Sequence, residues 1–268
     1  MNAGKWIVTL LAGIALPLVA SGEALTDVDE IVERANLAAY YSGEDGRSEA
    51  RMMIEDSQGR RQLRQFTVLR RNEEAGGDQH YMVFFSRPSD VRGTVFLVAK
   101  HMDRDDDRWL YLPGLDLVRR ISASDKRTSF VGSHFYYEDV SGRNPALDEH
   151  RLVETTDAHY VLESTPRDPA AVEFVRYVTR VDRDTFLPVK TEYYDGQDRV
   201  YRVMEVAEVE DVQGYPTATR SLISMPLEGG STLMEFRSIE YDVGLPEDIF
   251  SERYLRQPPT RWLQRDGG

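Results

Sequence analysis

Residues 79–86 read QHYMVFFS and residues 94–102 read TVFLVAKHM. Both runs are dense in aromatic and β-branched side chains, which favour strands. A strand with one face in water alternates apolar and polar residues, but these runs are apolar on both faces. We therefore predict two strands whose faces are both covered. One cover is a helix. The other is a second sheet, another protein or a bound apolar ligand.

Similar strand patterns continue on both sides of these runs. They recur about every 8–12 residues, and turn signals such as Ser57-Gln58-Gly59-Arg60 separate them. No strand–helix alternation is present, which argues against a parallel α/β fold. The pattern predicts one mainly β domain with about eleven to thirteen antiparallel strands, a barrel or a sandwich. The expected strands are 48–56, 61–71, 79–86, 94–102, 108–113, 115–121, 150–156, 160–164, 172–182, 189–194, 200–211, 217–225 and 232–242.

Helical signals are few. Thr26-Asp27-Val28-Asp29 is typical of a helix start, and apolar residues follow at helical spacing, so we expect a helix over 27–41. A short helix is expected from Pro246 to about Leu255. The segment 257–268 contains two prolines and two glycines, and we expect a flexible tail there.

Residues 122–148 interrupt the strand pattern. They are rich in Ser, Gly, Asn and Pro and are too long for an ordinary hairpin loop. We expect a structured insertion with a short helix at 136–140. Its compact aromatic cluster is Phe130, Phe135, Tyr136 and Tyr137.

The first 24 residues have the pattern of a signal peptide. Lys5 gives a basic start, Trp6–Ala20 is an unbroken apolar stretch, and small residues follow. The apolar stretch is shorter than a usual membrane span, which makes an uncleaved anchor the weaker alternative. We expect the domain to be residues 25–256. Because the chain has no cysteine to carry a lipid, we expect a soluble, non-lipidated protein of a bacterial periplasm.

Composition excludes several kinds of function. Lys and Arg total 33 against 46 Asp and Glu, so the net charge of −13 argues against a nucleic-acid partner. The absence of cysteine excludes disulfides, thiolate catalysis and iron–sulfur clusters. No HExxH, GxSxG, P-loop or GxGxxG pattern occurs, so we predict no catalytic residue, metal or cofactor. His101 with Asp103 and Asp105 comes nearest to a metal site, but acidic turns are ordinarily solvated.

A distinctive motif lies at residues 108–140, RWLYLPGLDLVRRISASDKRTSFVGSHFYYEDV. This text resembles the outer-membrane lipoprotein-sorting group of the LolA-like superfamily of bacterial periplasmic proteins. Weaker similarity covers most of residues 26–255. The chain departs from the pattern at His134, where an acidic residue is expected, and it is longer than the lipoprotein carrier itself. The matching residues are Trp109, Tyr111, Pro113, Arg119, Arg120, Gly132, Ser133, Phe135, Tyr137, Glu138 and Asp139.

The resemblance implies an open, curved antiparallel sheet, a half-barrel with helices covering its apolar concave face. It also implies carriage of acyl chains of lipids or lipoproteins between membranes, beside an inner-membrane transporter of the resistance–nodulation–division type. We expect a monomer. A packed sandwich core without a ligand stays the alternative to a lipid cavity. The predicted cavity residues, chosen by shared strand parity, are Met52, Ile54, Phe66, Val68, Met82, Phe84, Phe96, Val98, Trp109 and Tyr111.

Two further roles follow from the carrier interpretation. The insertion, with Phe130, Phe135, Tyr136 and Tyr137, is the candidate lid over the cavity, or else its rings only anchor a long loop. Arg119 and Arg120 are candidates for binding an anionic headgroup, or else they pair with acidic side chains across strands.

Two other functions stay open. The main rival is a sensor of the same fold that binds a lipid or lipoprotein and regulates a membrane protein. A more distant rival is an enzyme, which needs polar residues inside the cavity. The candidates on the predicted strands are few: His101, Lys100 and Arg119.

Overall fold

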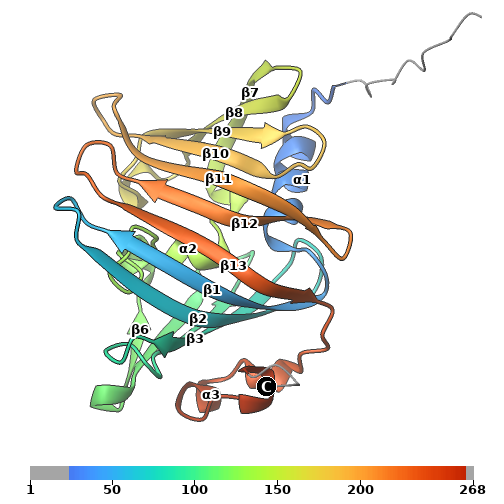
Figure 1. The fold of residues 1–268 in the computed structure, drawn as a ribbon. Helices are drawn as coiled ribbons and strands as arrows, with labels where there is room; N and C mark the ends of the chain where they lie inside the picture. The colour runs from blue at the N-terminus through green and yellow to red at the C-terminus, as the bar shows by residue number, and fades with distance from the viewer. Residues whose placement is uncertain (1–23, 264–268) are drawn as a thin grey trace, which may run out of the picture.

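The computed structural model describes residues 24–263, and within them a single antiparallel sheet of 13 strands dominates the fold (Figure 1). The sheet is open: its order is β6-β5-β4-β3-β2-β1-β13-β12-β11-β10-β9-β8-β7. The half-barrel prediction is confirmed, and the two-sheet sandwich is wrong. The predicted signal peptide lies almost wholly outside the described residues. Within residues 24–263 no helix is both long and apolar enough to cross a membrane.

Each of the predicted strands corresponds to an observed one. The strands are β1 (Asp45–Glu55), β2 (Arg61–Asn72), β3 (Gln79–Arg87), β4 (Val95–Lys100), β5 (Asp107–Leu112), β6 (Leu117–Ile121), β7 (Asp148–Thr155), β8 (His159–Pro166), β9 (Arg176–Asp182), β10 (Pro188–Tyr194), β11 (Val200–Val212), β12 (Tyr215–Ser224) and β13 (Ser231–Tyr241). The α-helices are α1 (Val28–Tyr40), α2 (Tyr137–Ser141), α3 (Glu252–Arg256) and α4 (Thr260–Leu263). Short 3-10 helices are η1 (Pro113–Leu115), η2 (Ala123–Asp125), η3 (Pro145–Leu147), η4 (Pro169–Ala171) and η5 (Glu247–Ile249).

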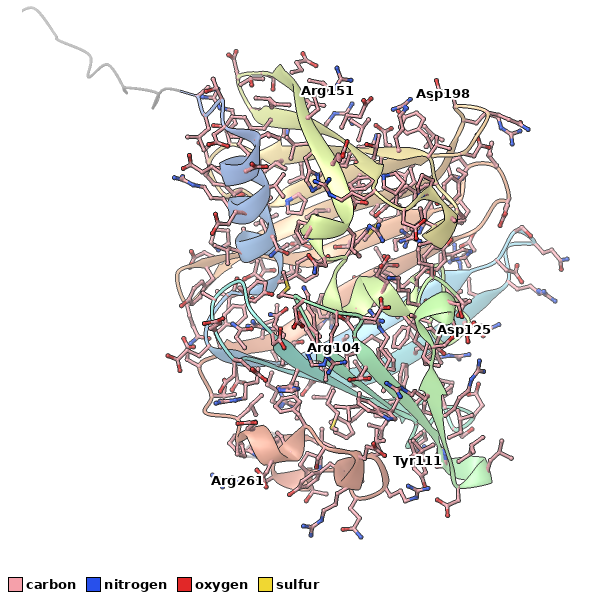
Figure 2. The ribbon with its side chains drawn as sticks, turned by 180° about the vertical axis from the view of Figure 1, so that it is seen from behind. Arg104, Tyr111, Asp125, Arg151, Asp198 and Arg261 are labelled. Atoms are coloured by element: carbon pink, nitrogen blue, oxygen red, sulfur yellow. The ribbon has the colours of Figure 1, made fainter. Side chains whose placement is uncertain are left out.

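Two meanders make up the sheet. The first runs from β1 to the edge strand β6, and the second runs from the opposite edge, β7, back to β13. Pairing of β1 with β13, for example Met52 opposite Met234, joins the two meanders at the centre. The predicted insertion is therefore the crossover between the two edges. Figure 2, seen from behind, shows this insertion and α1 lying in front of the sheet.

Helix α1 covers the concave face of the second meander. The Asp27 carboxylate accepts hydrogen bonds from the N–H groups of Asp29 and Glu30, which caps the start of the helix. Ile31 and Ala35 are its buried residues, and they pack with Tyr160, Leu162 and Val181 of β8 and β9.

The C-terminal segment covers the convex face of the first meander. The Asp45 carboxylate accepts the N–H groups of residues 243–245, and Leu245, Ile249, Phe250 and Leu255 then pack on the sheet. Part of the segment where a flexible tail is expected continues this packing. Residues 260–263 form α4, and the Arg47 side chain donates to the Trp262 carbonyl over 3.0 Å. Residues 264–268 lie outside the described part of the chain.

Candidate functional site

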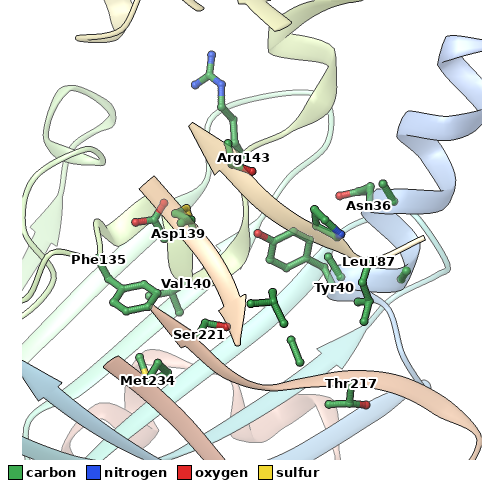
Figure 3. Close-up of a pocket in the computed structure, with 18 of the residues that line it drawn as sticks. Asn36, Tyr40, Phe135, Asp139, Val140, Arg143, Leu187, Thr217, Ser221 and Met234 are labelled. Atoms are coloured by element: carbon green, nitrogen blue, oxygen red, sulfur yellow. The ribbon is translucent and has the colours of Figure 1, made fainter. Parts of the chain in front are cut away.

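A cavity of about 450 Å³ lies between α1, the insertion and the concave face of the sheet. Figure 3 shows Tyr40 reaching into it from the end of α1, with Phe135 and Val140 of the insertion on the opposite side. This volume lies within the range of small-molecule and cofactor sites. The cavity is lined mainly by apolar side chains: Val32, Ala35, Ala38, Ala39, Phe66, Val68, Val83, Phe130, Phe135, Val140, Leu162, Val181, Leu187, Met204, Val206, Leu222, Ile223, Met234, Phe236 and Ile239.

Small residues on α1 leave the space open. Val32, Ala35, Asn36 and Ala39 are three or four positions apart and therefore share one face of the helix, which lines the cavity. Three alanines of α1 line the cavity where larger side chains would fill it. The alanines that predict a good helix thus also provide the volume of the cavity.

Strand register decides which sheet residues form the floor. Phe66 lies opposite Phe85, and Val68 opposite Val83, so all four point to the concave face. Within β12 and β13, Ser221 lies opposite Met234, and both lie on this same face and line the cavity.

The aromatic rings of the insertion anchor it in the concave core. Phe130 is 1% exposed, and its ring centroid lies 5.7 Å from Phe85, 5.3 Å from Phe96 and 5.6 Å from Tyr137. Such tilted and edge-to-face ring pairs stabilise a core beyond simple burial. The insertion is therefore a packed wall of the cavity.

Buried ion pairs hold the other side of the insertion. Glu138 on α2 is 2% exposed, and its carboxylate lies 2.6 Å from Arg127 and 3.2 Å from Arg143. Burial alone would raise the pKa of Glu138, but the two guanidinium groups outweigh burial and hold the pKa below its usual range. Arg143 also forms two hydrogen bonds to Asp148 of β7, at 2.8 and 2.9 Å. Because Asp139 pairs with Arg202 of β11, ion pairs fix α2 and the residues after it to two strands of the second meander, β7 and β11.

Close packing joins α2 to α1. Gly142, directly after α2, has a positive φ of 77°, and a Cβ there would lie 2.5 Å from the Tyr40 ring. Only glycine accommodates both the conformation and the approach. Beside them Lys100 is 1% exposed and donates to the Ser141 carbonyl over 2.9 Å. Burial lowers the pKa of Lys100 to about 8.

The predicted cavity residues divide between the two faces of the sheet. Six lie in the concave core: Met52, Ile54, Phe66, Val68, Phe96 and Val98. Of these, Phe66 and Val68 line the cavity itself. The face assignment is wrong for Met82, Phe84, Trp109 and Tyr111, which lie on the convex face under the C-terminal segment.

The wrong assignments follow from register. Val83 lies opposite Val68 and Leu110 opposite Phe96, so the concave residues of β3 and β5 are the odd-numbered and even-numbered ones respectively. A shift of one residue moves a whole strand to the other face, and apolar residues on both faces of β3 gave no signal to choose between them.

The remaining predicted residues lie at the wall and at the edge. Phe130 and Phe135 line the cavity, Tyr137 belongs to the concave core, and the Tyr136 ring lies under the guanidinium groups of Arg127 and Arg202. The exposed Arg119 and Arg120 lie on the edge strand β6, outside the cavity lining.

Arg119 and Arg120 both face acidic partners. Arg119 lies 3.7 Å from Asp125, and Arg120 pairs with Asp107. The structure therefore favours the pairing alternative over a headgroup site for these two arginines.

Residues that sequence reasoning missed come from α1 and the second meander. They are Ala38, Ala39, Tyr40, Tyr193, Ser221 and Leu222. Large apolar side chains are the usual sequence signal of a cavity, whereas small and polar side chains form much of this lining. The helical spacing of the alanines was the one available signal.

No metal site is evident among residues 24–263, where no three metal-binding side chains are grouped. His101 instead contacts Asp78 at 2.8 Å and Arg104 at 2.6 Å.

Comparisons place the chain among known proteins. A family model with the description "Uncharacterized protein" matches residues 77–257. A DUF1329 family protein from Desulfovibrio piger is 32% identical, with a TM-score of 0.76 over 85% of this chain and 96% of that one. No match was found among the curated proteins.

Two further solved structures have the same architecture. A putative outer membrane lipoprotein-sorting protein domain from Vibrio parahaemolyticus is 27% identical, with a TM-score of 0.78 over 86% of this chain and 98% of its own. A LolA superfamily protein from Nitrosomonas europaea is 20% identical, with a TM-score of 0.64 over 85% and 98%. The chain therefore belongs to the DUF1329 family and has a LolA-like fold.

Proposed function

We propose that the protein binds acyl chains of lipids or lipid-modified proteins in this cavity and carries them between membranes. The observation that supports the proposal most strongly is the apolar cavity between α1 and the concave face. The Vibrio protein with the same architecture is described as a putative lipoprotein-sorting domain, which agrees with the same class of ligand.

The energetics of transfer require such a cavity. Each buried methylene group contributes about 0.8 kcal/mol, so an acyl chain leaves a bilayer only for a comparably apolar site. Release requires one wall of the cavity to move. The insertion is the lid that the sequence predicts. However, its buried ion pairs and ring contacts make α1, whose buried residues are Ile31 and Ala35, the easier wall to displace.

The proposal includes a cellular compartment and a membrane transporter that works with the protein. We place the protein in the periplasm, because residues 1–24 have the pattern of a signal peptide. A transporter of the resistance–nodulation–division type is the proposed donor or acceptor of the cargo. With a net charge of −13, the protein is suited to a basic docking surface rather than to an anionic bilayer.

Lipid content tests the cavity. Ser221 of β12 lines the cavity, whereas the adjacent Arg220 is exposed on the opposite face. We expect Ser221→Trp to fill the cavity and Arg220→Trp to leave it open. Mass spectrometry of organic extracts from detergent-free protein is expected to find lipid in the wild type and in Arg220→Trp, with a loss of most of it in Ser221→Trp. Equal lipid in both variants would place the ligand elsewhere.

A further inference from the structure

One side of the cavity is polar, and its hydroxyl groups lack protein partners. Tyr40 at the end of α1, Tyr193 on β10 and Asp139 on α2 all line it. Among the described residues no group hydrogen-bonds to the hydroxyl of Tyr40 or of Tyr193. Burial raises the pKa of both phenols, so each remains a neutral O–H that can donate and accept.

Asp139 offers an acceptor on the same side. Its Oδ2 accepts the N–H of Tyr136 over 2.6 Å and pairs with Arg202, while no described residue donates to Oδ1. Its side chain is 6% exposed. Figure 3 shows the Tyr40 ring directed across the cavity toward the wall that carries Asp139.

The charges around this side are already balanced. Four basic and four acidic side chains pair with one another within 4 Å, while the buried Lys100 donates to the Ser141 carbonyl. The basic residues are Lys126, Arg127, Arg143 and Arg202, and the acidic ones are Glu138, Asp139, Asp148 and Glu173. Arg70, elsewhere in the lining, donates to the carbonyl groups of Tyr40 and Ser42 at the end of α1.

From this arrangement we infer that the cavity selects amphiphiles whose polar end is an uncharged hydroxyl group, and that it disfavours anionic headgroups. The inference rests on the proposed function and names the ligand class of the same cavity. A ligand hydroxyl donates to Asp139 Oδ1 and accepts from Tyr40 or Tyr193, which satisfies groups that the protein leaves unpaired.

An anionic head fits poorly for the same reason. A carboxylate or phosphate adds a negative charge beside Asp139, where Arg127, Arg143 and Arg202 already pair with carboxylates of the protein. Burying a charge without a partner costs far more than burying a hydroxyl that is hydrogen-bonded. Both kinds of ligand gain the same energy from chain burial, so the head decides between them.

A matched pair of ligands tests the inference. Hexadecanol and hexadecanoate have the same chain length and differ at the head. We would measure their displacement of the neutral fluorophore N-phenyl-1-naphthylamine from the full chain, at a pH where the acid is ionised. Hexadecanol is expected to bind at least about tenfold more tightly than hexadecanoate.

Single hydroxyl deletions locate the effect. Tyr40→Phe and Tyr193→Phe keep the rings, and each is expected to weaken hexadecanol binding by about three- to tenfold while fluorophore binding stays unchanged. The neighbours Tyr41 and Tyr194 do not line the cavity. Tyr41→Phe and Tyr194→Phe are therefore the controls, and neither is expected to alter the preference.

The outcomes separate the two proposals. Equal or tighter binding of hexadecanoate would overturn the hydroxyl preference and leave lipid binding intact. An unchanged preference in the Tyr40→Phe/Tyr193→Phe double variant would likewise overturn it. Failure of the fluorophore and both lipids to bind would overturn the cavity function itself.

Discussion

Glu138 shows how single residues shape this protein. It belongs to the motif that carries the resemblance, and no pattern in the sequence explains why this position is acidic. In the structure its buried carboxylate holds Arg127 and Arg143 together, and through them it fixes the insertion to the second meander. The motif residue is therefore positioned to build the cavity wall.

Replacing Glu138 tests this role. We expect Glu138→Gln to lower the free energy of unfolding at neutral pH by about 3 kcal/mol, because it leaves two buried guanidinium groups short of a partner. Glu149→Gln, at an exposed pair with Arg167, is expected to change it by less than about 0.5 kcal/mol. Urea denaturation of the three proteins provides the comparison.

The same variant has a defined pH dependence. The folded pKa of Glu138 is depressed below its usual value of 4.5, so its stabilisation is present above pH 4.5 and is lost as the pH falls through the folded pKa. The stability difference between the wild type and Glu138→Gln is expected to narrow below about pH 4.5. A difference that is constant with pH would show that Glu138 contributes through packing rather than charge.

At the scale of elements, the sequence predicted where helices and strands occur better than which face of the sheet each strand residue occupies. The helix at 27–41 is observed at Val28–Tyr40, and the short helix at 136–140 is observed at Tyr137–Ser141. Spacing and capping are local signals, which explains this agreement. The face of β3 depends on its register with β2, a non-local property, and there the prediction was wrong.

Replacing Phe84 tests which face of β3 lines the cavity. It is 5% exposed and packs on the convex face with residues of the C-terminal segment. We expect Phe84→Ala to lower the free energy of unfolding by about 3–5 kcal/mol and to leave lipid content per folded molecule unchanged. Loss of lipid from folded Phe84→Ala protein, in the extracts used for Ser221→Trp, would contradict the assignment of β3.

The whole molecule combines one open sheet with two different covers. The C-terminal segment packs tightly on the convex face, whereas α1 and the insertion leave a cavity over the concave face. Strand patterns alone predicted a mainly β fold but did not distinguish a barrel from a sandwich. The pairing of edge strands and the curvature of the sheet decide between them, and neither is a local property of the sequence. The polar side of the cavity was not predictable, since Tyr40, Asp139 and Tyr193 come from distant segments.

Transfer between membranes tests the central claim most directly. Donor vesicles made from radiolabelled envelope lipids and unlabelled acceptor vesicles of different density would be incubated with the wild type, Ser221→Trp or Arg220→Trp. We expect the wild type and Arg220→Trp to move label to the acceptor at a rate proportional to protein concentration, and Ser221→Trp to reduce it to the rate without protein. Transfer by Ser221→Trp at the wild-type rate, or no transfer by the wild type, would contradict a carrier that works through this cavity.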